Sequence, residues 1–360
     1  MPTETESQSN RASTPPPDVK TTASSPSQQR ILALDFTKGA LVLIMVLYHW
    51  MNYFTSLNWT YYRYLHFLTP SFILVSGFLI SNVYLSKYRA TDPRPGRRLF
   101  TRGLKLLAVF VVLNAANIFV LPMLSKGSTA LDNGGLGRLL AVFSSGNVFT
   151  AAGRAVTFYI LVPISYLLLL SAALLLPYRS NKHTFHVACV LFLGCILTLD
   201  LNRLQYPNLE FVTIGLLGIL AGFIPIEKVN HFVMHPYVLA FAYAGYVIAI
   251  TVWDVPFPLL IVGAFLSVGA IYLGGLRGDQ PGRARRHVIL LGKYSLLGYI
   301  AQIAILRLLS AGLRHVNLAF VVLGFSFVAA FALTMLSVEA VDQARARSTI
   351  ADRLYKAVFA

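Results

Sequence analysis

The stretch ALDFTKGALVLIMVLYHWMNYFT, residues 33–55, decides how this chain is interpreted. Its apolar run is long enough to cross a lipid bilayer as an α-helix, which takes about 20 residues. Nine further apolar segments follow, at approximately residues 65–86, 104–124, 156–177, 184–200, 209–226, 233–252, 257–275, 287–310 and 317–338. They predict an all-α integral membrane protein, a polytopic bundle of about ten transmembrane helices.

The overall composition supports the same class. Of the 360 residues, 56% are hydrophobic and 12% are charged, and the mean hydropathy is +0.65. In a soluble domain, about a quarter of the residues are charged. No segment shows the alternating ten-residue pattern of a transmembrane β-barrel.

The net charge of +16 is interpreted by position, because lysines and arginines that flank membrane spans report topology. With both termini in the cytoplasm, 23 of the 30 basic residues fall in inner segments. The chain is therefore predicted to be N-in and C-in, with membrane lipids and no nucleic acid as partners. The remaining basic residues fall outside or near the outer span ends: Arg63, Lys126, Arg138, Arg154, Arg203, Arg307 and Arg314.

Three regions are expected along the chain. Residues 1–30 are rich in Ser, Thr, Pro and Gln and predict a disordered cytoplasmic tail. Residues 31–340 form the membrane domain, and residues 341–360 are a cytoplasmic C-terminal tail. The longest loop, about 125–155, is glycine-rich and either shapes a ligand site or is a surface loop without a role.

Ionisable residues inside spans are costly and often functional, which singles out the first span. His49 follows Lys38 by eleven residues, which places both on one helix face about 16 Å apart. Asp35 precedes Lys38 by three residues, a spacing that allows an ion pair. A buried neutral imidazole suits a general base. The alternative is a packing histidine bonded to a backbone carbonyl.

A basic cluster precedes the third span and includes Arg94, Arg97, Arg98, Arg102 and Lys105. Arginines of this kind bind either the phosphates of a cosubstrate or anionic lipid headgroups, and charge alone does not separate the two. Small residues of the second span favour close helix packing.

Five short motifs, in the order in which they occur, resemble the membrane acyltransferase type 3 family. That family has relatives among heparan-glucosaminide acetyltransferases and glucan succinyltransferases. The resemblance covers essentially residues 30–340. The motifs are Leu34-Asp35-Phe36-Thr37-Lys38-Gly39 with His49, Ser76-Gly77-Phe78, Arg98 with Arg102, Phe158-Tyr159-Ile160-Leu161-Val162-Pro163, and Leu291-Gly292-Lys293-Tyr294-Ser295-Leu296-Leu297-Gly298-Tyr299.

The resemblance implies an enzyme that moves an acyl group from a cytoplasmic acyl-CoA to a hydroxyl. The acceptor would be an envelope glycan or a lipid-linked saccharide, and the location a bacterial inner (plasma) membrane. His49 matches the catalytic histidine, Lys38 stands where the family has arginine, and Arg98 and Arg102 match the donor-associated pair. Acyl-CoA is then a cosubstrate, with no tightly bound cofactor.

Further candidates come from the mechanism and the remaining motifs. Ser76 is a candidate donor to the negative charge of a tetrahedral intermediate. Either direct transfer or a histidine-bound acyl intermediate fits the residues. The other candidates are Asp35, Tyr159, Ser295, Tyr299 and Gln302.

The chain also departs from the family pattern. Ala155 stands where an acid is usual, and Gln302 where a histidine is usual. No metal site is expected, because His231 and His235 have no cysteine or acidic cluster nearby. The competing class is a transporter or flippase of an anionic small molecule, although no internal repeat is found.

Overall fold

The computed structural model describes residues 31–55, 62–85, 92–124, 135–144, 146, 149–150, 153–154, 157–233, 235–253, 255–277, 282–313 and 319–359. The tail predicted at residues 1–30 lies outside the described residues, as do residues 125–134 of the longest loop.

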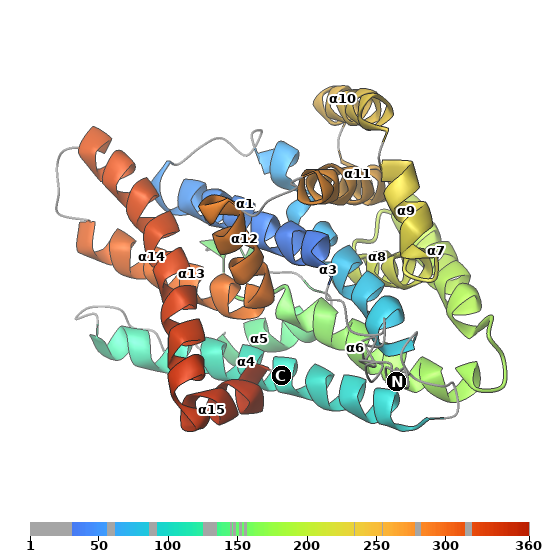
Figure 1. Ribbon diagram of the computed structural model, residues 1–360, viewed down its shortest axis with the longest axis horizontal. Coiled ribbons are helices and arrows are strands. Elements are labelled where there is room, and N and C mark those ends of the chain that lie inside the picture. Colours follow the sequence, from blue (N-terminus) through green and yellow to red (C-terminus); the bar gives the residue numbers. More distant parts are fainter. Residues whose placement is uncertain are drawn as a thin grey trace, which may run out of the picture. The chain divides into compact units, whose positions relative to one another are not determined.

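The described chain is helical almost throughout (Figure 1). A small antiparallel hairpin pairs β1, Phe149–Thr150, with β2, Gly153–Arg154. The helices are α1 Leu32–Phe54, η2 Arg63–Leu65, α3 Leu68–Leu79, η3 Ile80–Leu85, α4 Arg94–Leu124, α5 Gly135–Ser144, α6 Leu161–Tyr178, α7 Thr184–Leu201, α8 Pro207–Ala221, α9 Ile226–Val233, α10 Pro236–Val252, α11 Phe257–Leu276, α12 Arg283–Lys293, α13 Ser295–Leu313, α14 Ala319–Arg347 and α15 Thr349–Phe359.

Every predicted membrane segment contains a helix. Among the described residues, eight helical stretches are long and apolar enough to cross a membrane, and the apolar helices α8 and α10 are shorter. Large apolar side chains on the outside of the bundle include Val190, Phe241 and Phe320, which are 69%, 79% and 90% exposed. Lipid would cover these side chains, whereas a soluble protein rarely exposes so many. The prediction of an all-α polytopic membrane protein is confirmed.

The segment predicted at 287–310 is divided into two helices. Helix α12 ends at Lys293 and α13 begins at Ser295, because Tyr294 leaves the helical conformation at φ −112° and ψ 29°. The Tyr294 side chain is buried, and its hydroxyl donates to Asp342 of α14 at 2.5 Å. Apolar periodicity does not reveal such a break, since both helices continue the apolar run.

Helix α1 is the hub of the bundle and contacts α3, α11, α12, α13 and α14. Gly39 of α1 and Gly292 of α12 let the two backbones touch. A Cβ at Gly39 would overlap the carbonyl oxygen of Val288, and one at Gly292 would overlap that of Asp35. Small residues allow this close approach between membrane helices.

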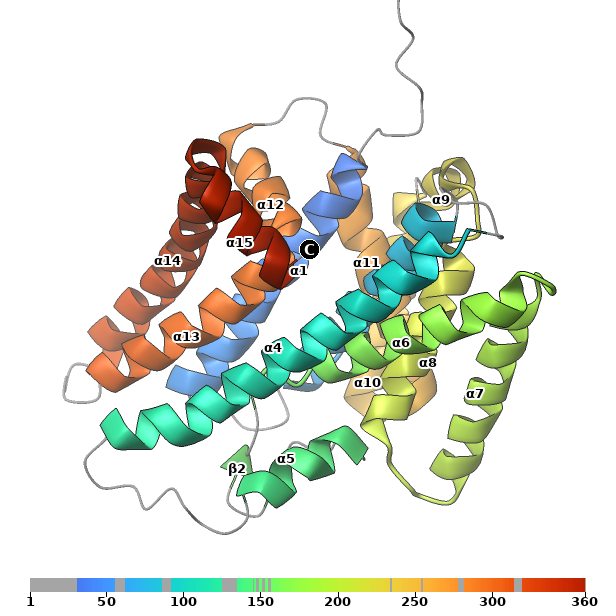
Figure 2. The same ribbon diagram turned by 90° about the horizontal axis from the view of Figure 1, so that it is seen from below.

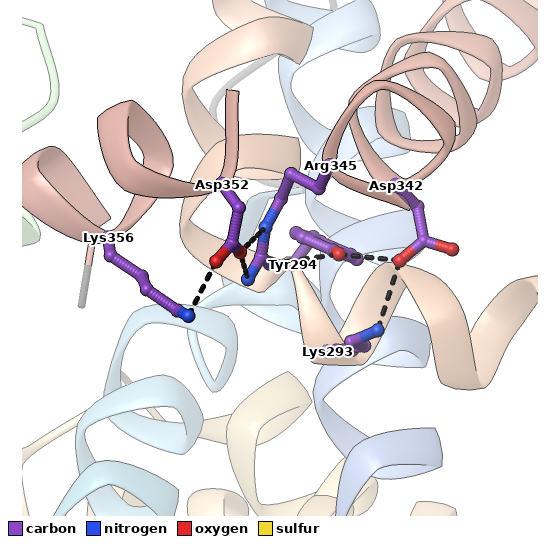
Figure 3. A network of polar contacts seen from close by, with 6 residues as sticks. All are labelled: Lys293, Tyr294, Asp342, Arg345, Asp352 and Lys356. Atoms are coloured by element: carbon purple, nitrogen blue, oxygen red, sulfur yellow. Dashed lines mark hydrogen bonds and ion pairs between the residues drawn. The ribbon is translucent and has the colours of Figure 1, made fainter. Parts of the chain in front are cut away.

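The corner between α12 and α13 is tied to the last two helices by a polar network (Figure 3). Arg345 of α14 donates to the Tyr294 hydroxyl at 2.9 Å and to Asp352 of α15 at 2.6 Å. Lys356 also pairs with Asp352, at 2.5 Å. The hydrogen bonds from Lys356 and Arg345 lower the pKa of Asp352, so this tie is present above the ordinary carboxyl pKa and weakens in acid.

The α1–α12 contact yields a stability prediction. Gly292→Ala should destabilise the protein by about 1–3 kcal/mol, because the new methyl group has no space against the α1 backbone. The measurement is the apparent Tm of the purified protein in detergent. Gly324→Ala is the matched control, since a Cβ at Gly324 of α14 meets nothing within 4 Å. Equal Tm values for the two variants would show that the backbones separate easily.

Candidate active site

The start of α4 forms a basic entrance, a hollow of about 450 Å³. Arg94, Arg98 and Arg102 recur every four residues and therefore share one face of α4. Arg97, Thr101 and Tyr84 complete the lining. The Arg102 guanidinium donates to the Tyr84 hydroxyl at 3.2 Å, which orients it. The structure thus brings the two predicted donor-binding arginines, Arg98 and Arg102, to one hollow.

A narrower middle cavity of about 140 Å³ adjoins the basic entrance and shares Tyr84 and Arg102 with it. It lies among α3, α4, α6 and α13. Its polar lining includes Ser76, Ser295 and Tyr299, and the remainder is mainly aliphatic. The Ser76 hydroxyl donates to the carbonyl oxygen of Phe72 at 2.8 Å. Ser76 therefore lines the middle cavity rather than the cavity that contains His49.

The histidine cavity, of about 350 Å³, adjoins the middle cavity and shares Ile160 and Tyr299 with it. His49 is 6% exposed and lies in contact with two aromatic rings. The ring centroids of Tyr48 and Tyr299 are 5.2 Å and 6.4 Å from that of His49. The other polar groups of the lining come from Asn52, Tyr53, Thr69, Thr157, Tyr159 and Arg307.

Three neighbouring hollows with shared wall residues therefore lie in a row between the arginines of α4 and the imidazole of α1. Tyr299 belongs to both the middle and the histidine cavities and is 8% exposed. Tyr299 therefore stands at the junction of the two cavities. The geometry suits a long ligand with an anionic end at α4 and a reactive end at Tyr299.

The turn before α6 forms a wall of the histidine cavity. Phe158 adopts φ 60°, a left-handed conformation that is uncommon for a bulky residue and tends to occur at functional sites. The buried Asn114 of α4 holds this turn. Its side-chain amide donates to the carbonyl oxygen of Thr157 at 2.9 Å and accepts from the Thr157 N–H at 3.1 Å. The sequence gives no signal for Asn114, which resembles an ordinary polar residue of a span.

Tyr159 is held by a second clamp. Its hydroxyl donates to the Asn208 side-chain oxygen at 3.0 Å. The Asn208 amide donates to the carbonyl oxygens of Val142, at 2.7 Å, and Phe143, at 3.3 Å, at the end of α5. The Tyr166 hydroxyl also donates to the Phe143 carbonyl oxygen, at 2.8 Å. Asn208 therefore couples helix α5 of the long loop to the cavity wall.

Asp35 and Lys38 form the ion pair that their spacing allows, at 2.7 Å. Neither residue lines any of the three cavities. Lys38 occupies the same helix as His49, and its predicted role at the donor stays a prediction.

Of the two residues that depart from the family pattern, the structure describes Gln302 but not Ala155. Gln302 is fully buried, lines none of the three cavities, and has no hydrogen-bond partner for its amide among the described residues. Ala155 lies outside the described residues. The described part of the chain holds no cluster of three or more metal-ligating side chains.

The profile of the family described as "Heparan-alpha-glucosaminide N-acetyltransferase, catalytic" matches residues 30–127. The match contains His49, Ser76, Arg98 and Arg102. This match to part of the chain supports an enzyme that transfers acyl groups other than aminoacyl groups, and it gives the transporter alternative no support. No curated protein and no solved structure matches the chain.

The Asn208 clamp gives a prediction that is independent of activity. In a chain whose Cys189 and Cys195 are serine, Val142→Cys should resist a maleimide reagent, because Val142 is fully buried. Adding Asn208→Ala should make labelling at position 142 at least several times faster, since this change removes the donor to the Val142 carbonyl and one of the two donors to the Phe143 carbonyl. Tyr166→Phe is the control and removes one bond to the same helix end. Unchanged labelling after Asn208→Ala would show that α5 is held by other contacts.

Proposed function

We propose that this chain transfers an acyl group, acetyl or similar, from acyl-CoA to a saccharide hydroxyl across the bundle. The observation that carries the proposal is the row of three cavities that leads from the arginine cluster to His49. An acyl-CoA has phosphates at one end and a thioester at the other, so it matches the row in both chemistry and direction. The match over residues 30–127 supports the same reaction class.

The donor is proposed to bind with its phosphates on Arg98 and Arg102 of the basic entrance. Arginine N–H groups match phosphate oxygens and form strong, charge-assisted hydrogen bonds. The thin pantetheine arm would occupy the aliphatic middle cavity, passing Ser76 and Ser295. In this pose the thioester carbonyl lies beside Tyr299, at the boundary of the histidine cavity.

The acceptor is proposed to bind in the histidine cavity, whose hydroxyls, amide and aromatic rings suit a saccharide. His49 takes the proton of an acceptor hydroxyl, and the hydroxyl oxygen attacks the thioester carbonyl carbon. The tetrahedral intermediate then collapses, the carbon–sulfur bond breaks, and the thiolate takes the proton from His49. The products are the acyl ester and free CoA. A histidine-bound acyl intermediate is the two-step form of the same reaction.

The oxyanion of that intermediate needs a hydrogen-bond donor. Ser76 is the candidate that the sequence offers, but its hydroxyl donates to Phe72 within its own helix. Tyr299 lines both cavities, and we propose it as a second candidate for the role. Ser76 keeps a place along the path of the donor.

The positive-inside bias supports a cytoplasmic basic entrance and a histidine cavity near the opposite face. With acyl-CoA in the cytoplasm, the acceptor would be an envelope glycan or lipid-linked saccharide that enters from the outside. The resemblance to type 3 acyltransferases and glucan succinyltransferases supports a bacterial inner membrane as the location. Radiolabelled acetyl-CoA incubated with purified protein and envelope extract tests the proposal, which requires label in glycan.

The role of His49 leads to a first prediction. His49→Ala should lower the transfer rate by about 10²- to 10⁴-fold, the usual contribution of a general base or acid. The apparent Tm should stay close to that of the wild type, because the proposed role is chemical. His235→Ala, at an exposed histidine, is the control and should keep full activity. More than a tenth of wild-type activity in His49→Ala would exclude the general-base role.

The basic entrance leads to a second prediction. Arg98→Ala and Arg102→Ala should each raise the KM for acetyl-CoA about tenfold or more and leave kcat nearly unchanged. Hydrogen bonds to a charged group contribute about 1.5–3 kcal/mol, and contacts remote from the thioester stabilise ground and transition states alike. Arg283→Ala changes an exposed arginine outside the three cavities and serves as the control. A fall in kcat alone would contradict donor binding at these arginines.

A further inference from the structure

The histidine cavity contains a charge that the proposed reaction does not use. Among the described residues that line it, Arg307 of α13 is the only one with a permanent charge. Arg307 is half-buried, and its Nε donates to the Tyr53 hydroxyl at 3.1 Å. Tyr53 follows His49 by four residues on α1 and lines the same cavity. The guanidinium is therefore oriented by the helix that carries His49.

Membrane topology does not account for this arginine. Most basic residues of the chain lie in segments assigned to the cytoplasmic side, and Arg307 belongs to the few near the other face. A positive charge there opposes the topological bias instead of serving it. Ionisable groups within spans are costly, and they usually mark a ligand or substrate path. Arg307 thus calls for a functional explanation.

The chemistry of the lining indicates what the charge binds. An arginine guanidinium presents N–H groups in a fixed fork that matches a carboxylate or phosphate. Asn52, Thr69, Thr157 and Tyr159 add uncharged hydrogen-bonding groups to the same cavity. This combination suits a saccharide with one anionic substituent better than a neutral one, because hydrogen bonds between two charged groups are stronger than those to a neutral group.

We infer that the acceptor is an acidic saccharide, whose carboxylate or phosphate binds Arg307 while its reactive hydroxyl faces His49. The inference rests on the proposed function and names the substrate class of the same site. Arg307 is then the residue that selects acceptors. It is not required for donor binding, because it lies outside the basic entrance and the middle cavity.

Three small acceptors that share a sugar ring test the inference with the full-length chain in nanodiscs and radiolabelled acetyl-CoA. They are methyl glucuronide, its uncharged 6-amide, and methyl glucoside 6-phosphate. The wild type should show a KM at least tenfold lower for one or both anionic acceptors than for the amide. The comparison between the two anions distinguishes a carboxylate from a phosphate site.

Arg307→Gln should remove this preference. Its KM for the preferred anion should rise tenfold or more, while its KM for the amide changes less than twofold and its KM for acetyl-CoA stays constant. Arg307→Lys keeps the charge and should restore part of the preference. Arg203→Gln changes an exposed arginine that lines none of the three cavities and should behave as wild type.

The outcomes separate the inference from the function on which it rests. Equal use of the glucuronide and its amide by the wild type would overturn the inference and leave the acyltransferase proposal standing. The same holds if Arg307→Gln keeps the anionic preference. If the wild type acylates neither these acceptors nor any glycan in envelope extract, the proposed function itself is wrong. The wild-type comparison decides the question even if Arg307→Gln does not fold.

Discussion

The direct backbone contact between α1 and α12 is the constraint on which the site depends. Gly39 and Gly292 have no side chains, so the two helices approach until each glycine meets the other helix's carbonyl groups. Helix α13 begins two residues after α12 ends and therefore inherits its position from this contact. Tyr299 and Arg307 both belong to α13, and both reach the cavity of His49. A side chain at either glycine would move these residues away from the imidazole.

Contacts at the periphery of the site then fix the turns that border it. The turn at Tyr294 is tied to α14 and α15 through Arg345, Asp342 and Asp352, which keeps α13 at its angle to α12. As Figure 2 shows, α15 lies between α14 and α4, so the C-terminal helix also touches the helix that carries the basic entrance. On the other side of the site, the buried Asn114 amide holds the turn before α6 by donating to the Thr157 carbonyl oxygen. The buried Asn208 amide accepts from the Tyr159 hydroxyl of the same turn and donates to carbonyl oxygens of α5. A missing partner for either buried amide would be costly.

The distribution of polarity along the three cavities follows from the cost of burying charged and polar groups without partners. Guanidinium groups gather at the basic entrance, and the middle cavity is mainly aliphatic. Hydroxyls, amides and one guanidinium gather again around His49. Under the proposed function, the aliphatic section separates a charged donor end from a polar acceptor end. One aromatic and one aliphatic side chain, Tyr299 and Ile160, form the wall that the two inner cavities share.

Much of the fold was predictable from the sequence, because an apolar run of about 20 residues has few alternatives to a membrane helix. The ten segments, the ion pair of Asp35 with Lys38, and the basic face of Arg98 and Arg102 all follow from local spacing. The break at Tyr294 was not predictable, since it depends on a hydrogen bond to α14. In the sequence, Arg307 stands out only as a positive charge on the side of the membrane that the topological bias disfavours. That signal does not tell which group the charge contacts.

The sequence by itself thus determined the helices, their membrane class and the chemistry available on each one. It did not determine which helices meet, because helix faces of similar apolarity could pack against one another in many pairings. The glycine contacts and the buried amides select the pairings that form. Tertiary structure therefore decided that Tyr299 borders both inner cavities and that Ser76 lines a different cavity from His49. It also decided that Asn208, 159 residues along the chain from His49, supports the wall of the same cavity.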